Sequence, residues 1–182
     1  RGTHPANADE LRAVLDSDLP VLVDADGLTL LARDEDGRSV ELLRERTAHT
    51  LLTPHAGELA RLLGVDREEV EARRLEHATR ARDHFGCTVL LKGSTTLIAH
   101  PGAPVVADPT GTPLLATAGT GDVLSGVIGA LLSAGVPARE AAMCGAYLHG
   151  RAAVLARGGA PIGASDLMDG LSLAVEEVRR AR

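Results

Sequence analysis

The stretch Leu115–Gly126 carries the strongest chemical signal in the chain. Gly119, Thr120 and Gly121 run straight into apolar residues at helical spacing, which predicts a small-residue loop that ends at a helix N-terminus. Free N–H groups and the positive end of the helix dipole attract phosphate at such a point. Asp122 falls in the first turn, where its carboxylate could take a proton from a reacting hydroxyl. The alternative is an ordinary helix cap after a glycine turn, because short glycine motifs also occur without a ligand.

Lys92 is the only lysine in the chain, and its position matters for that reason. It follows the strongly β-type run Cys87–Leu91, and the small residues Gly93, Ser94, Thr95 and Thr96 come directly after it. An ammonium beside a glycine and small hydroxyls is typical of a phosphate contact. The alternative is a hairpin turn with an exposed lysine, in which Leu97–Ala99 forms the antiparallel partner strand.

Acids and a histidine follow two further predicted strands. Asp24 and Asp26 come after the apolar run 20–23, and His55 comes after 50–53. In open α/β sheets the carboxyl ends of parallel strands face the ligand crevice. Asp24 and Asp26 could therefore face a hydrated cation, or they could cap a helix over 28–32. His55 is either a site residue or a structural donor beside the turn.

The remaining pattern alternates strands with helices. We expect a helix over 7–16 capped by Asn7, and a solvated connection with some helix over 33–46. The pattern also predicts one long amphipathic helix over 66–85, with Val70, Leu75 and Ala78 on its inner face. Further helices are expected over 59–63, 138–156 and 166–180, the last capped by Ser165. Another has Asp122 in its first turn and is broken at Gly135–Pro137, and an edge strand is expected over 105–107. This order predicts a three-layer α/β/α sandwich with a mostly parallel sheet.

Composition excludes several classes of function. The 182 residues suit a single domain over 1–182, and the net charge of −6 with only Phe85 and Tyr147 as aromatic residues argues against a nucleic-acid surface. No apolar run approaches the roughly 18 residues of a membrane span. Cys87 and Cys144 lack metal-type spacing, so we expect both to be reduced, buried packing residues of a cytoplasmic protein.

Four motifs together resemble the ADP- or ATP-dependent NAD(P)H-hydrate dehydratase family, a branch of the ribokinase-like fold. They occur in the family's order, and they are Val23–Asp26, Leu52–Glu58, Leu90–Thr96 and Ala118–Gly126. The second motif separates this branch from the sugar and vitamin kinases that share the GTGD element. The resemblance covers nearly the whole chain. It also implies about a hundred further residues before Arg1 in a complete domain, so we expect an N-terminally incomplete one.

The resemblance implies roles for the motif residues. His55 and Asp122 would contact the hydrated nicotinamide substrate, with Asp122 as the catalytic base. Lys92, Gly93, Ser94, Thr95 and Thr96, together with Gly119, Thr120 and Gly121, would bind the adenine nucleotide. The family further implies ADP or ATP as co-substrate, an ancillary Mg²⁺ and a homotetramer.

The expected function is the nucleotide-dependent dehydration of hydrated NADH or NADPH back to the reduced coenzyme. Two other functions use the same residues. One is a ribokinase-type kinase for a hydroxymethylpyrimidine or thiazole, which would release a stable phosphoester. The other is a nucleotide-binding domain without turnover.

Overall fold

A five-stranded sheet forms the centre of the computed structural model, which describes residues 5–156 and 163–181. The strands are β1 (Val21–Val23), β2 (Thr50–Leu52), β3 (Thr88–Leu91), β4 (Thr96–Ala99) and β5 (Val106–Asp108), in that order across the sheet. β1, β2 and β3 pair in parallel, and β4 is antiparallel to both of its neighbours. Four of the five strands therefore run in one direction, as the sequence predicts.

Alternation along the strands separates the two faces of the sheet. Leu52 and Leu91 belong to one apolar cluster, whereas Leu51 and Leu90 belong to another. Successive side chains of a strand point to opposite faces, so β2 and β3 contribute to both clusters. Burial on both faces is typical of a sheet covered by helices on each side.

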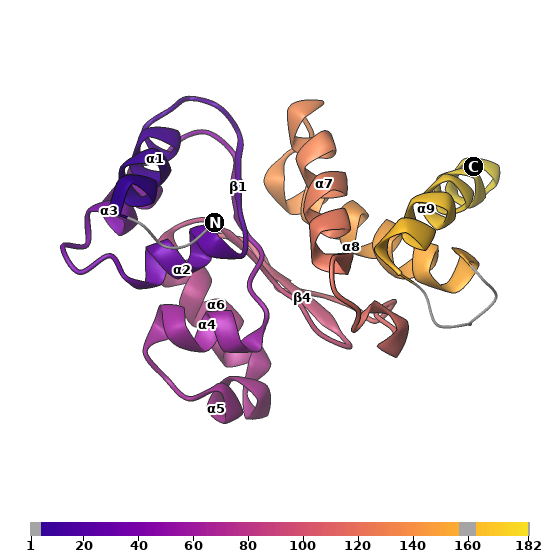
Figure 1. Ribbon diagram of the computed structural model, residues 1–182, viewed down its shortest axis with the longest axis horizontal. Coiled ribbons are helices and arrows are strands. Elements are labelled where there is room, and N and C mark those ends of the chain that lie inside the picture. Colours follow the sequence, from indigo (N-terminus) through magenta and orange to yellow (C-terminus); the bar gives the residue numbers. More distant parts are fainter. Residues whose placement is uncertain (1–4, 157–162, 182) are drawn as a thin grey trace.

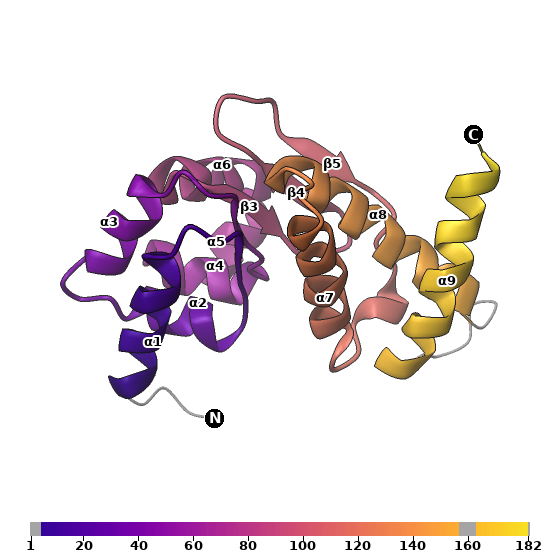
Figure 2. The same cartoon turned by 90° about the horizontal axis from the view of Figure 1, so that it is seen from above.

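Helices cover each face of the sheet and complete the predicted three-layer sandwich (Figures 1 and 2). One face carries α1 (Pro5–Leu15), α2 (Asp26–Ala32), α3 (Arg38–Glu45), α4 (Ala56–Leu63), α5 (Arg67–Ala72) and α6 (Arg74–Phe85). The other face carries α7 (Thr120–Ser133) and α8 (Ala138–Ala156). α9 (Ala164–Arg180) packs along α8, where a Cβ at Gly170 would lie 2.3 Å from the carbonyl oxygen of Ala152. A short 3₁₀ helix, η1 (Pro113–Leu115), precedes α7.

The single long helix predicted over 66–85 is wrong. The backbone leaves helical geometry at Arg73, which divides the segment into α5 and α6. Val70 and Ala78 are buried as expected, but Leu75 is 58% exposed. The helical period does not continue through the break, so Leu75 faces outward. The break also places Arg74 at the start of α6.

Three smaller predictions are also wrong. Asn7 lies inside α1, because the helix begins at Pro5, a residue favoured in a first helical turn. Gly163 occupies the N-cap of α9 in place of Ser165. Cys144 is exposed on α8, although Cys87 is buried, and burial raises the pKa of the Cys87 thiol to about 12. Both cysteines are free thiols.

Among the described residues, no helix is both long and apolar enough to cross a membrane.

Candidate active site

The carboxyl ends of β1, β2 and β3 meet the N-terminus of α7 around the side chain of Lys92. Lys92 Nζ lies 2.8 Å from Asp24 Oδ1, which follows β1, and 3.9 Å from Glu58 Oε2 on α4. A Cβ at Gly121 would lie 3.7 Å from the same ammonium nitrogen. The only lysine of the chain is therefore held at the glycine turn that begins α7, and it is not a free surface lysine.

Asp24 connects Lys92 to α7. Its second carboxylate oxygen accepts a 2.7 Å hydrogen bond from Ser125 Oγ on α7. The N-cap of α2 is Ala25 and has no side-chain cap bond, so the alternative in which Asp24 caps this helix is wrong. Asp26 lies in the first turn of α2 and is exposed. Asp24 instead ties together two elements that are far apart in the sequence.

His55 follows β2 and begins α4. Its Nδ1 accepts hydrogen bonds from the backbone N–H groups of Gly57 and Glu58, while Glu58 Oε2 accepts from His55 N. This capping box satisfies donors that a helix N-terminus otherwise leaves open. Burial lowers the His55 pKa, and Lys92 lowers it further, which favours the neutral ring that Nδ1 needs in order to accept. His55 therefore caps α4 as an acceptor, not as the donor that the structural alternative describes, and its role toward a substrate stays a prediction.

Arg74 holds the loop that follows Lys92. Its Nη2 donates to the carbonyl oxygens of Leu91, Lys92 and Thr95 at 3.1–3.4 Å. A Cβ at Gly93 would lie 2.3 Å from Nη2, so the glycine makes room for the guanidinium. The backbone N–H groups of Gly93 and Ser94 donate to no other described residue. Carbonyl oxygens at this loop therefore accept hydrogen bonds from Arg74, and the N–H groups of Gly93 and Ser94 are available to bind an anion.

The turn before α7 is held in a different way. Thr120 Oγ1 lies 2.7 Å from the carbonyl oxygen of Leu115 and 2.8 Å from that of Thr117. His149 on α8 donates from Nε2 to the carbonyl oxygen of Thr120 at 2.8 Å. Gly119 adopts the left-handed conformation, with φ +85°. The N–H groups of Gly121 and Asp122 again donate to no described residue, so they form an open helix N-terminus.

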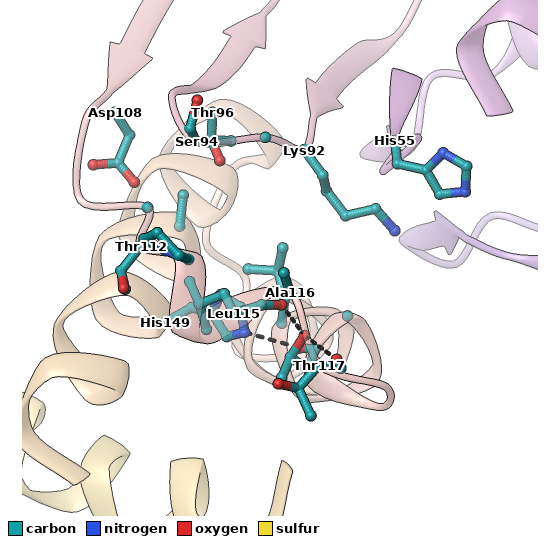
Figure 3. A pocket seen from close by; sticks show the side chains of 18 residues that line it. His55, Lys92, Ser94, Thr96, Asp108, Thr112, Leu115, Ala116, Thr117 and His149 are labelled. Carbon is teal, nitrogen blue, oxygen red and sulfur yellow. Dashed lines mark hydrogen bonds between the residues drawn. The ribbon is translucent and has the colours of Figure 1, made fainter. Parts of the chain in front are cut away.

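A cavity of about 580 Å³ lies between these two loops (Figure 3). Its lining includes the expected site residues His55, Lys92, Gly93, Ser94, Thr96, Thr120 and Gly121. Thr95, Gly119 and Asp122 lie beside the cavity in the chain but do not line it, and Asp122 is exposed in the first turn of α7. The volume is that of an ordinary small-molecule site.

Sequence analysis did not identify Asp108, His149 or Arg74 as site residues. Asp108 ends β5 and His149 lies in the middle of α8, and both line the cavity. The one signal in the sequence is Gly150 beside His149, because a glycine inside a helix often marks a close contact. In the structure a Cβ at Gly150 would lie 2.2 Å from Thr110 Oγ1. That contact brings α8 against the loop after β5.

Comparison with known proteins identifies the family. A family model described as NAD(P)H-hydrate dehydratase matches residues 2–169. The chain belongs to the NAD(P)H-hydrate dehydratase family. It is 41% identical over 180 residues to the ADP-dependent (S)-NAD(P)H-hydrate dehydratase of Neisseria meningitidis. It is 50% identical over 167 residues to the bifunctional NAD(P)H-hydrate repair enzyme Nnr of Mycobacterium leprae.

A solved structure of the same family has the same fold. The ADP/ATP-dependent NAD(P)H-hydrate dehydratase of Bacillus subtilis, co-crystallised with ATP/Mg²⁺ and soaked with CoA, superposes with a TM-score of 0.85 at 30% identity. The match covers 97% of this chain and 63% of that one.

This family member spans only part of its relatives. The matched regions cover 98% of the chain but 60% of the Neisseria enzyme, and 92% of the chain but 33% of the Mycobacterium enzyme.

Proposed function

We propose that this chain takes part in the nucleotide-dependent dehydration of the S epimer of hydrated NADH or NADPH, which restores the reduced coenzyme. The observation that carries the proposal is the convergence of His55, Lys92 and the open N-terminus of α7 at one cavity. Membership of the dehydratase family supports it, as do the activities named for the Neisseria and Bacillus proteins. The reaction class is a hydro-lyase that consumes ADP or ATP.

The residue roles are those that the family resemblance implies, and the positions of the loops support them. Lys92, Gly93, Ser94, Thr95 and Thr96 would bind the nucleotide from one wall, and Gly119, Thr120 and Gly121 from the other. The open N–H groups of both loops suit phosphate oxygens. His55 Nε2 and the Asp122 carboxylate would contact the hydrated nicotinamide. Asp122 is one residue from Gly121, which lines the cavity.

The nucleotide converts the substrate hydroxyl into a better leaving group. Hydroxide leaves poorly, so the substrate hydroxyl first attacks the terminal phosphoryl group of the nucleotide. Asp122 accepts the proton of that hydroxyl, while the N–H groups of α7 and the Lys92 ammonium stabilise charge on the transferring group. The C–O bond then breaks as the ring nitrogen donates its electron pair, and inorganic phosphate leaves. The substrate loses a proton to restore the ring double bond.

Mg²⁺ fits this site only as a companion of the nucleotide. The described residues contain no cluster of three or more His, Cys, Asp or Glu side chains able to hold a metal ion. Asp24 is engaged by Lys92 and Ser125. Phosphate oxygens and water would therefore supply the ligands of Mg²⁺, which keeps several waters in such sites. The ion would neutralise phosphate charge.

The decisive experiment is the absorbance at 340 nm after mixing the protein with hydrated NADH, Mg²⁺ and either ADP or ATP. A nucleotide-dependent rise is expected. Asp122→Ala should lower the rate by roughly 10²- to 10⁴-fold, the usual cost of losing a general base, without unfolding the protein. The matched control, Asp83→Ala, removes an exposed acid on α6 and should leave the rate unchanged. Near-normal turnover in Asp122→Ala would exclude this residue as the base.

Two substitutions separate the structural and functional roles of His55. Asn is a good N-cap residue, so His55→Asn should keep the stability that His55→Ala loses, about 1 kcal/mol. Both variants should raise the KM for the hydrated coenzyme, because both lose the imidazole. Thermal unfolding and steady-state kinetics measure the two effects. An unchanged KM in His55→Asn would leave His55 with its capping role alone.

The kinase alternative uses the same catalytic base and the same two nucleotide-binding loops, but it releases a phosphoester. Phosphorus NMR distinguishes the two reactions, because dehydration yields inorganic phosphate and a kinase yields a stable phosphoester. Nucleotide binding without either product would instead indicate a binding domain. The family named by the comparisons favours dehydration.

We further infer a cytoplasmic homotetramer, on the strength of the family resemblance and of two free cysteines. Analytical ultracentrifugation of the chain tests the tetramer.

A further inference from the structure

The cavity has opposite chemistry at its two ends. At one end lie the Lys92 ammonium and the open N-terminus of α7. At the other lies Asp108, the one acidic side chain that lines the cavity in the described part of the chain. Figure 3 shows the Asp108 carboxylate beside Ser94 and Thr96, on the far side of Lys92 from His55. A ligand with one anionic end therefore has a preferred orientation.

Asp108 is buried and only partly satisfied. The residue is 9% exposed, Oδ1 accepts from Thr110 N at 3.1 Å and Oδ2 accepts from Thr110 Oγ1 at 2.8 Å. An ionised carboxylate has about four acceptor positions, so about two stay open toward the cavity. A buried acceptor gains most from a donor that the ligand brings.

His149 adds a second acceptor between the two ends, because its ring reaches Thr120 at the start of α7 while Gly150 beside it packs against Thr110. Its Nε2 donates to the Thr120 carbonyl oxygen, so in the neutral ring Nδ1 carries a lone pair. Nδ1 makes no hydrogen bond to any residue that the structure describes. The ring is 7% exposed, and burial lowers its pKa, which keeps it neutral near pH 7. The positive charge of Lys92 lowers that pKa further, and the negative charge of Asp108 raises it. The neighbour of His149 in the chain, Gly150, packs against Thr110, the residue that donates to Asp108.

A nucleotide matches this polarity in one direction only. Its phosphates carry negative charge, whereas its nucleoside carries donors, namely the ribose hydroxyls and the 6-amino group of adenine. Phosphate at Asp108 would place like charges together in a partly buried site. Donors at Asp108 and His149 would instead meet open lone pairs.

We propose that Asp108 and His149 bind the nucleoside end of the nucleotide through its hydroxyl or amino donors, and so select the nucleoside and direct the phosphates to Lys92. The inference deepens the proposed function and rests on its nucleotide dependence. It assigns specificity to two side chains that lie on β5 and α8, outside the four sequence motifs.

Titration calorimetry of the 182-residue chain with three Mg²⁺ complexes tests the proposal. ADP is compared with IDP, which lacks the 6-amino group, and with 2′-deoxy-ADP, which lacks one ribose hydroxyl. The wild-type protein should bind at least one analogue roughly ten- to hundredfold more weakly than ADP, the ratio expected when a donor to a charged acceptor is lost.

Asp108→Asn should reduce that discrimination at least about tenfold, because an amide places a donor where the carboxylate accepts. The matched control, Asp83→Asn, makes the same change of charge on the exposed surface of α6 and should keep the wild-type ratios. Loss of the IDP ratio in Asp108→Asn assigns the contact to the amino group. Loss of the 2′-deoxy-ADP ratio assigns it to the ribose.

Three other results overturn the inference. Equal affinity of the wild-type protein for all three nucleotides would remove any role for donors, and this comparison needs no variant. Discrimination that persists in Asp108→Asn would remove the role of Asp108. Absence of ADP binding would overturn the inference together with the proposed function. Discrimination by Asp108 without any dehydration of hydrated NADH would instead leave the inference standing and refute only the proposed function.

Discussion

Two glycine-containing loops line opposite sides of the cavity, and they are fixed by different means. The loop after β3, residues 92–96, is held by the guanidinium of Arg74, which reaches three carbonyl oxygens from α6. The turn before α7 is held by the hydroxyl of Thr120 and by the neutral ring of His149 on α8. A charged donor from one face of the sheet thus supports one wall, and neutral donors from the other face support the second.

The comparison shows how a glycine loop can become an anion site. Glycine allows a close approach but loses more backbone entropy on folding than any other residue. In both loops a side chain from a neighbouring helix binds the carbonyl oxygens, and the N–H groups stay open. We call the Arg74 guanidinium the charged clamp, and the Thr120 hydroxyl with the His149 ring the neutral clamp. The charged clamp should contribute more to nucleotide binding, because hydrogen bonds to charged groups are worth about 1.5–3 kcal/mol and those between neutral groups about 1 kcal/mol.

Among changes to the side chains that hold the two loops, the largest effect is expected from Arg74→Met. Loss of the guanidinium frees the carbonyl oxygens of Leu91, Lys92 and Thr95 at the loop after β3, so the Kd for Mg·ADP should rise roughly ten- to hundredfold. Turnover at saturating nucleotide should change much less, because the α7 turn is intact. Arg74→Lys should restore part of the affinity. Arg73→Met is the matched control, since Arg73 pairs only with Glu69 and Glu76 among the described side chains. An unchanged Kd in Arg74→Met would refute the charged clamp.

A smaller loss of affinity is expected from Gly93→Ala. The added methyl would lie 2.3 Å from Arg74 Nη2, but the guanidinium is the end of a flexible side chain and can move. We expect a rise in Kd of up to about tenfold. The double variant with Arg74→Met should bind no more weakly than Arg74→Met alone, because both changes remove the same contact. Additive losses would mean that Gly93 acts independently of Arg74.

His149, which holds the turn before α7, should affect turnover as well as nucleotide affinity. His149→Leu removes one neutral hydrogen bond from the turn that carries Asp122, so kcat should fall about three- to tenfold. Steady-state kinetics with hydrated NADH measure this, and His49→Leu, at an exposed position after α3, provides the control. A change confined to the KM for ADP would give His149 no role in placing the turn.

The smallest expected effect is a dependence of stability on pH. Burial lowers the pKa of both His55 and His149 in the folded state below the unfolded value of about 6.5. The unfolded chain then binds more protons as the pH falls below about 6.5, so the free energy of unfolding should decrease toward acid pH. Urea denaturation between pH 7.5 and about pH 5.5 measures the slope. His149→Leu should flatten it, and an identical slope would assign the dependence to other groups.

The motifs predicted the Lys92 end of the cavity better than the Asp108 end. Lys92 directly follows β3, and Gly121 lies in the first turn of α7. The hydrophobic pattern predicts both elements, and the structure brings the two residues close together. Leu75 and Cys144 were placed inside by helical periodicity or by residue type, and the structure exposes both. No glycine or proline marks the break at Arg73, so the helical periodicity predicted one continuous helix across it.

By itself the sequence determined the order of strands and helices, the parallel start of the sheet and the loops that face the ligand edge. These follow from local patterns, because alternation, helical spacing and glycine turns act over a few residues. Only the tertiary structure decided that Asp24 would pair with Lys92, that Arg74 would hold the nucleotide loop, and that Asp108 and His149 would share a cavity. Such contacts join residues that are distant in the chain, and they exist only once the helices have packed on both faces of the sheet.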